Sequence, residues 1–134
     1  MLNYNFVESI PETPLDFIVH VNRPKKPNYP FYVNNNKLEN PELECSGPAE
    51  YNLQAEVYEW LHNDQKNSYT RGKIIYKYLQ ENKVLATCLN LQDGLAIKAK
   101  GIVVFRKLFA GKAVSLWGSV AQDRDGYLYV PFLF

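Results

Sequence analysis

The sequence predicts a single α+β domain over residues 1–134, with one or two helices packed on an antiparallel meander of about five strands. Three observations lead to this prediction. Apolar residues recur at helical spacing over Pro48–Asp64, and short β-rich runs follow one another from Lys83 to the end of the chain. The five glycines beyond residue 93 lie seven to ten residues apart, which is typical of the turns of a meander.

The first half of the chain combines a short strand with a long loop. Asp16–Asn22 is rich in β-forming residues, and alternation would place Phe17, Val19 and Val21 on one face. Residues 22–48 contain five prolines and six asparagines. Because proline and asparagine favour turns and extended backbone, we expect an irregular, proline-rich loop near the N-terminus.

Two segments in the middle of the chain are candidate helices. Within Pro48–Asp64 the apolar residues fall three or four positions apart, and a proline suits the first helical turn. Ser68–Asn82 has two interpretations. Apolar pairs at 74–75 and 78–79 favour a helix, whereas lysine alternating with β-branched and aromatic residues is also typical of a strand. We prefer the helix.

Residues 83–134 are predicted to form the sheet. Asp93-Gly94 is a strong signal for a hairpin turn, because both central positions of that turn need positive φ. Pro131 cannot donate a ladder hydrogen bond, so the last strand is expected at an edge. The predicted strands are Val84–Leu91, Leu95–Lys100, Ile102–Phe109, Lys112–Trp117 and Tyr127–Phe134.

Charge divides the chain into two unlike halves. Residues 1–64 hold ten acidic and four basic residues, which gives a net charge of −6. Residues 65–134 hold four acidic and eleven basic residues, which gives +7. The overall charge of +1 therefore conceals a basic second half, and a surface of that kind attracts nucleic acid or acidic proteins.

Familiar catalytic and cofactor signatures are absent from the sequence. There is no G-x-G-x-x-G, no phosphate-binding P-loop and no G-x-S-x-G or S-x-x-K nucleophile motif. Cys45, Cys88, His20 and His62 have no recognisable ligand spacing, so we expect no metal and no cofactor. A small enzyme with a site near Asp16 and His20 is retained as an alternative, although an extended strand would hold these two about 13 Å apart.

The sequence shows neither a membrane segment nor a secretory signal. It has no run of about 18 apolar residues, and its first residues, MLNYNFVESIPETP, lack both a basic residue and a long apolar run. Two cysteines without a C-x-x-C pair fit a reducing compartment. We therefore expect a cytoplasmic protein that does not enter the membrane.

The candidate binding residues of the second half are all basic. If the predicted strands pair, they gather these side chains into one patch that attracts phosphates or carboxylates without reading sequence. The residues of this predicted patch are Lys98, Lys100, Arg106, Lys107 and Lys112.

The long loop supplies a second group of candidate binding residues. Arg23, Lys25 and Lys26 lie beside Tyr29 and Tyr32, whose rings could stack on unpaired bases. Basic side chains next to aromatic rings are the usual means of holding single-stranded nucleic acid.

We therefore expect a small, non-enzymatic binding protein whose basic second half contacts nucleic acid or an acidic protein surface. Two other interpretations of the same charges stay open. The bases form a solvated face or pair with the acidic first half, or they join copies of the chain. The C-terminal segment YLYVPFLF either completes the core or pairs with a partner's sheet edge, which would make the chain a homo-oligomeric or protein-inhibiting module.

Overall fold

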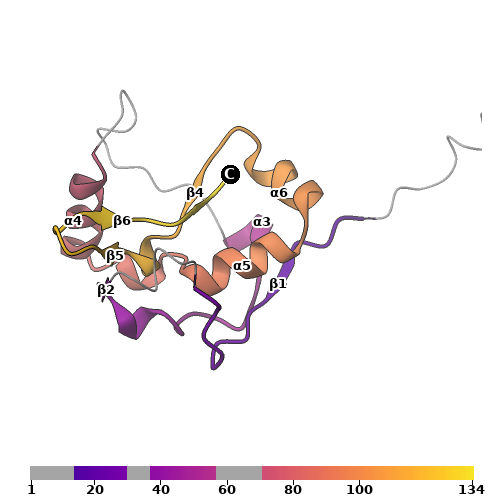
Figure 1. Cartoon of the computed structure of the whole chain (residues 1–134). Helices are drawn as coiled ribbons and strands as arrows, with labels where there is room; N and C mark the ends of the chain where they lie inside the picture. Colours follow the sequence, from indigo (N-terminus) through magenta and orange to yellow (C-terminus); the bar gives the residue numbers. More distant parts are fainter. Residues whose placement is uncertain (1–13, 30–36, 57–70) are drawn as a thin grey trace, which may run out of the picture.

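A computed structural model describes residues 14–29, 37–56 and 71–134, and it confirms the α+β class (Figure 1). Its α-helices are α3 (Leu53–Glu56), α4 (Gly72–Glu81), α5 (Leu91–Ala99) and α6 (Ile102–Phe109). Three short 3-10 helices accompany them, η1 (Pro41–Leu43), η3 (Leu85–Thr87) and η4 (Trp117–Ser119). The strands are β1 (Ile18–His20), β2 (Lys37–Leu38), β3 (Glu50–Asn52), β4 (Val114–Ser115), β5 (Ala121–Gln122), β6 (Leu128–Tyr129) and β7 (Phe132–Leu133).

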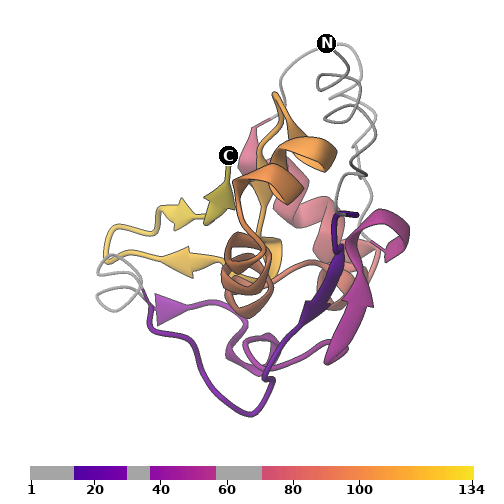
Figure 2. The same ribbon diagram turned by 90° about the vertical axis from the view of Figure 1, so that its right-hand side faces the viewer.

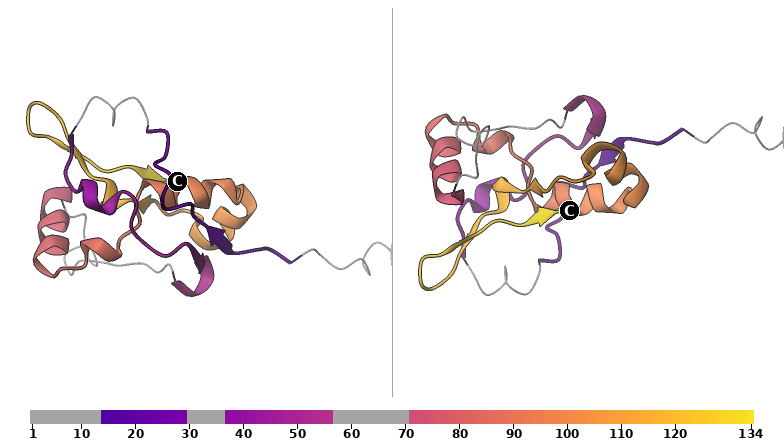
Figure 3. Two further views of the ribbon diagram at one scale, coloured as in Figure 1. Left: turned by 90° about the horizontal axis from the view of Figure 1, so that it is seen from below. Right: turned by 90° about the horizontal axis from the view of Figure 1, so that it is seen from above.

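The strands form three small antiparallel sheets. β1 pairs with β3, β5 lies between β2 and β6, and β4 pairs with β7. In the views of Figures 1 and 3, α4 lies at one end of the molecule and α6 at the other, with α5 between them. The sheets of β1 and of β7 lie against α5, and the strands do not form one continuous layer.

The strand predicted at Asp16–Asn22 is confirmed as β1. Val19 and Val21 are buried and Phe17 packs against them, as the alternation predicts. The partner strand β3 corrects the helix predicted over Pro48–Asp64, because residues 50–52 are extended and the helix begins only at Leu53. The pairing of Val19 with Tyr51 explains the difference, since a ladder to β1 satisfies this backbone. Residues 57–64 of the predicted helix lie outside the described residues.

The helical interpretation of Ser68–Asn82 is confirmed by α4, which is ten residues long. Ile75, Tyr76 and Leu79 are buried on one side of it, while Ile74 on the other side is exposed. The spacing of the apolar pairs therefore outweighs the β propensity of the individual residues.

The predicted meander is wrong between residues 84 and 109. Residues 85–87 form η3, and the two strands predicted after it are the helices α5 and α6. Asp93-Gly94 does not turn a hairpin, because Asn90 begins a helix three residues earlier. The Asn90 side chain accepts a hydrogen bond from the Asp93 N–H (3.0 Å), and the Asp93 carboxylate accepts one from the Asn90 N–H (2.9 Å). This reciprocal pair satisfies two donors that a helix start leaves open.

Helix α6 carries a run of β-branched and aromatic residues that resembles a buried strand. Along the helix, however, exposed positions 102–103 and 106–107 alternate with the inward positions 104–105 and 108–109. This is helical periodicity, with the inward residues facing the core. The basic pair at 106–107 lies on the outward side.

The last part of the chain follows the prediction more closely. Lys112–Trp117 contains β4, and Tyr127–Phe134 contains β6 and β7. Within the described chain β7 pairs with β4 alone, so it has one unpaired edge, and Pro131 immediately precedes it. The edge position fits the missing N–H of proline.

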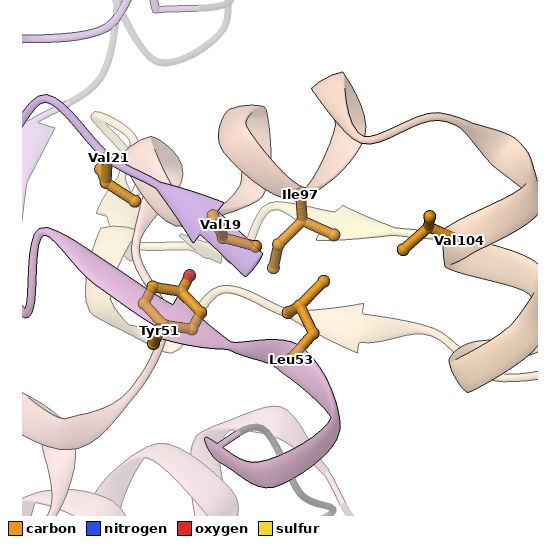
Figure 4. Packing of buried hydrophobic residues seen from close by; sticks show 6 residues of the cluster. All are labelled: Val19, Val21, Tyr51, Leu53, Ile97 and Val104. Atoms are coloured by element: carbon orange, nitrogen blue, oxygen red, sulfur yellow. The ribbon is translucent and has the colours of Figure 1, made fainter. Parts of the chain in front are cut away.

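Two apolar clusters hold these elements together. The first joins β1 and β3 of the acidic half to α5 and α6 of the basic half (Figure 4). Its buried members are Val19, Val21, Tyr51, Leu53, Ile97 and Val104. The second cluster lies under α4, and its buried members are Ile75, Tyr76, Leu79, Leu85 and Val120. Of the helices in the described ranges, none has both the length and the apolar character needed to cross a bilayer.

Candidate functional site

Arg23 was expected at a binding surface, and the structure places it in the interior instead. Its Nη2 atom lies 2.7 Å from Oδ1 of Asp93, and both side chains are almost completely buried. Its Nε atom donates a hydrogen bond to the Pro48 carbonyl oxygen (3.0 Å), and the Tyr51 hydroxyl donates to the same Asp93 oxygen (2.7 Å). A buried cation needs such partners, so Arg23 holds the fold and is not available to a ligand.

The amide side chains at the start of α5 extend this buried polar network. Nδ2 of Asn90 donates to the carbonyl oxygens of Leu43 (2.8 Å) and Ser46 (3.1 Å). Nε2 of Gln92 donates to those of Arg23 (2.9 Å) and Lys25 (2.8 Å). Two irregular segments of the first half are therefore fixed to one helix start.

A buried carboxylate, that of Glu44, completes the network. Its two oxygens accept hydrogen bonds from the Tyr29 hydroxyl (2.7 Å) and the Ser119 hydroxyl (2.9 Å). Burial and the neighbouring Glu44 charge raise the pKa of Tyr29 far above its ordinary value. The hydroxyl of Tyr29 is thus committed to Glu44, which does not match a ring exposed for stacking. Tyr32 lies outside the described residues.

This network is what the sequence analysis missed. Asn90 and Asp93 are separated by the three-residue step of a capping box, which is a recognisable signal for a helix start. Nothing in the sequence indicates that Arg23 is the ion-pair partner, because seventy residues separate it from Asp93.

The loop bases Lys25 and Lys26 are exposed, but they lie away from the bases of the second half. In Figures 1 and 2 the loop that follows β1 lies at the bottom of the molecule and α6 lies towards the top. The two predicted groups of binding residues therefore do not form one surface.

Lys100 is also removed from the predicted patch. Its Nζ atom lies 2.9 Å from Oδ2 of Asp16, and its side chain is mostly buried. This hydrogen bond, together with one from the Ile18 N–H, holds the pKa of Asp16 below its ordinary value. His20 has a different partner, because its Nδ1 atom lies 3.4 Å from Oε1 of Glu50. Asp16 and His20 are thus each paired elsewhere on the surface.

Four predicted bases stay exposed near the end of the molecule where α5 passes into α6. They are Lys98 on α5, Arg106 and Lys107 in the last turn of α6, and Lys112 just beyond it. Lys98, Arg106 and Lys107 form no ion pair with any residue of 14–29, 37–56 or 71–134. Figure 2 faces this end of the molecule and shows α6 directly above the end of α5.

Two large apolar side chains lie on the outward side of α6, next to Arg106 and Lys107. Ile102 is 61% exposed and Val103 is 62% exposed. Each lies four residues before a base, so the helix stacks Ile102 next to Arg106 and Val103 next to Lys107. We call these four residues the α6 surface. Phe105 and Leu108 face the other way and pack on the first apolar cluster.

The α6 surface is suited to holding an anion and not to proton transfer. Arginine and lysine are cationic at neutral pH, and both donate hydrogen bonds to carboxylates and phosphates. Among the residues that the structure describes, no three histidine, cysteine or acidic side chains are gathered in a way that could hold a metal ion, and His62 lies outside this part.

Comparison with protein-family models, with curated proteins and with solved structures finds no match to this chain.

Cys88 gives a prediction that tests the packing around η3. Both cysteines are free thiols, and burial raises the pKa of Cys88 to about 11. Because the thiolate is the reactive form, alkylation by iodoacetamide at pH 8 should be on the order of 100-fold slower in the folded protein than in urea. Mass spectrometry of a Cys45→Ser variant measures this rate, which should rise as the pH approaches 11. Equal rates with and without urea would contradict the prediction.

Proposed function

We propose that this chain is a non-enzymatic binding protein that recognises a negatively charged partner through the α6 surface and the neighbouring Lys98. The observation that carries the proposal is that Lys98, Arg106 and Lys107 are exposed with no carboxylate partner within the described part of the chain. Arg23 and Lys100, two further bases that the sequence predicted at a binding surface, each have one. Unpaired cations at one end of a molecule create a local positive potential that draws anions to that end.

The alternative is that Arg106 and Lys107 only stabilise α6 and bind no partner. Bases in the last turn of a helix interact favourably with its dipole, by about 0.3–1 kcal/mol each. That role requires no exposed apolar residues beside them. The coincidence of both kinds of side chain on one side of α6 favours the binding role.

A second candidate function uses the C-terminal strand. Phe132 and Phe134 are exposed, their ring centroids lie 5.5 Å apart, and in the described chain β7 has one unpaired edge. An exposed edge with apolar side chains can add a strand from another molecule, either a second copy or a target protein. Light scattering of the full chain and of a Phe132→Ser/Phe134→Ser variant tests self-association. An unchanged mass that corresponds to one chain would contradict pairing between copies.

The free thiols Cys45 and Cys88 support the cytoplasm as the compartment in which the chain works, because unpaired thiols persist where the environment is reducing. Expression with a fused fluorescent protein and cell fractionation would test this placement.

The proposed function is tested by reversing the charges of the α6 surface. An Arg106→Glu/Lys107→Glu variant should bind a labelled poly-glutamate peptide about tenfold more weakly than the natural chain. The reason is that two attractions of about 0.2–1 kcal/mol each become repulsions of similar size. Fluorescence anisotropy at low ionic strength measures the affinity, which should fall as salt is added.

The control is Lys73→Glu/Lys77→Glu, which reverses two exposed bases on α4 at the other end of the molecule, one of which, Lys77, lies 3.8 Å from Glu81. This control should retain the natural affinity. A milder Arg106→Gln/Lys107→Gln variant covers the case in which glutamates destabilise the end of α6. If both α6 variants fold, by circular dichroism, and bind the peptide as the natural chain does, the proposed function is wrong.

A further inference from the structure

We infer that the partner of the α6 surface is an acidic segment of another protein that also carries aliphatic side chains, and that Ile102 and Val103 receive these side chains. The inference rests on the proposed function and adds to it the chemical class of the partner. Ile102 and Val103 carry the inference, because a site that binds by charge alone does not need exposed aliphatic side chains.

Ile102 and Val103 are the most exposed apolar side chains of α6. Ile102 and Val103 are each about three-fifths exposed, although they begin a helix whose Val104, Phe105 and Leu108 pack in the first apolar cluster. Single exposed apolar residues are ordinary on protein surfaces. Two adjacent ones, each one helical turn from a cation, form a small patch with an apolar part and a cationic part. A complementary surface therefore needs both apolar groups and anions.

Charge selects among the partners that could cover such a patch. Two α6 surfaces from two copies would oppose cation to cation, so symmetric pairing through this surface is unfavourable. A carboxylate-bearing protein segment neutralises Arg106 and Lys107, and its own aliphatic side chains cover Ile102 and Val103. Such an arrangement, with an apolar centre beside charged pairs, is the usual anatomy of a protein interface.

Nucleic acid and membrane fit the patch less well. A phosphate backbone would satisfy the bases but would place Ile102 and Val103 against charged oxygen atoms, where they gain nothing. Binding in a bilayer interface needs a broad apolar helix face. On α6 that face is already used, because Phe105 and Leu108 pack on the core of the protein.

Two synthetic peptides of equal charge provide the test. One is an acidic helical peptide with two adjacent leucines on its glutamate-bearing face, and the other has both leucines replaced by serine. The full chain should bind the leucine peptide at least about tenfold more tightly, measured by fluorescence anisotropy. An Ile102→Ser/Val103→Ser variant should bind the two peptides equally. The matched control is Ile74→Ser, an exposed isoleucine on α4, which should keep the tenfold preference.

Each other outcome has a defined meaning. If charge reversal at 106 and 107 abolishes binding but the two peptides bind equally well, the inference is wrong and the proposed function stands. If neither Arg106→Glu/Lys107→Glu nor Ile102→Ser/Val103→Ser changes the affinity for either peptide, the inference and the proposed function are both wrong. If a single-stranded oligonucleotide or an anionic phosphatidylserine vesicle binds more tightly than the leucine peptide, and does so through Arg106 and Lys107, the partner class is wrong. Self-association that Ile102→Ser/Val103→Ser removes would identify a second copy and also overturn the inference.

Discussion

Replacing Asp93 by asparagine is expected to lower the free energy of unfolding by about 3–5 kcal/mol. The substitution keeps the size of the side chain but removes the negative charge that faces Arg23 at 2.7 Å. A guanidinium with almost no access to water is then left without its counter-charge, and the Tyr51 hydroxyl loses a charged acceptor. Because small proteins are stable by only about 5–15 kcal/mol, this loss is a large share of the total.

Urea unfolding followed by circular dichroism measures the effect. The matched control is Asp125→Asn in the exposed turn before β6, where the change should stay within about 0.5 kcal/mol. Arg23→Met combined with Asp93→Asn should be less destabilised than the sum of the two single variants, because the unpaired charge is gone. A loss below about 1 kcal/mol for Asp93→Asn would show that the guanidinium finds another counter-charge or reaches water.

Replacing Ile97 by alanine is expected to cost about 2–5 kcal/mol of unfolding free energy. Ile97 is fully buried (0% exposed) where β1, β3 and α6 meet, and its removal leaves a cavity between them (Figure 4). Leu95→Ala is the matched comparison. Leu95 is 42% exposed on the same helix, so its loss should be less than ~1 kcal/mol.

Ile97→Ala and Leu95→Ala together distinguish the helix α5 from the strand that the sequence predicted at Leu95–Lys100. In a strand, residues 95 and 97 share one face, so both substitutions would lower the free energy of unfolding by similar amounts. In α5, the two residues lie on different sides of the helix. Similar losses of stability for Ile97→Ala and Leu95→Ala, by urea unfolding, would contradict the helical assignment.

The elements predicted correctly are those that bury one face only, because their apolar residues then recur at the spacing of a strand or a helix. β1 alternates between buried and exposed residues, and α4 buries Ile75, Tyr76 and Leu79 at helical spacing. α5 offers no such pattern. Leu91, Gln92, Asp93 and Gly94 at its start are all buried, because polar and apolar partners contact it from several directions. A helix surrounded in this way loses the periodicity that sequence analysis depends on.

Gly94 illustrates the same difficulty at a single position. In sequence it resembles half of a hairpin turn, but it lies within α5, where the backbone passes close to Leu116. A Cβ atom at this position would come within 2.5 Å of Leu116 Cδ1. The residue is needed for close packing between distant segments, and one sequence alone does not show which segments meet.

The candidate site was predicted in part. The sequence correctly indicated exposed bases at 98, 106, 107 and 112, since long charged residues seldom lie fully inside a protein. It did not reveal that Arg23 is an exception, nor that Ile102 and Val103 are exposed. Both features depend on which side of a helix faces the core, and that in turn depends on contacts across the chain.

The buried network at the start of α5 has a consequence for how the chain is made. Its donors and acceptors come from residues 22–48 and from residues 90–93, so neither set is satisfied alone. During synthesis the acidic half leaves the ribosome before α5 has been made. Until then Arg23 has no buried partner and its guanidinium stays hydrated. Native structure around Arg23 therefore forms only after residues 90–93 have been synthesised, and its rate depends on closure of a long loop.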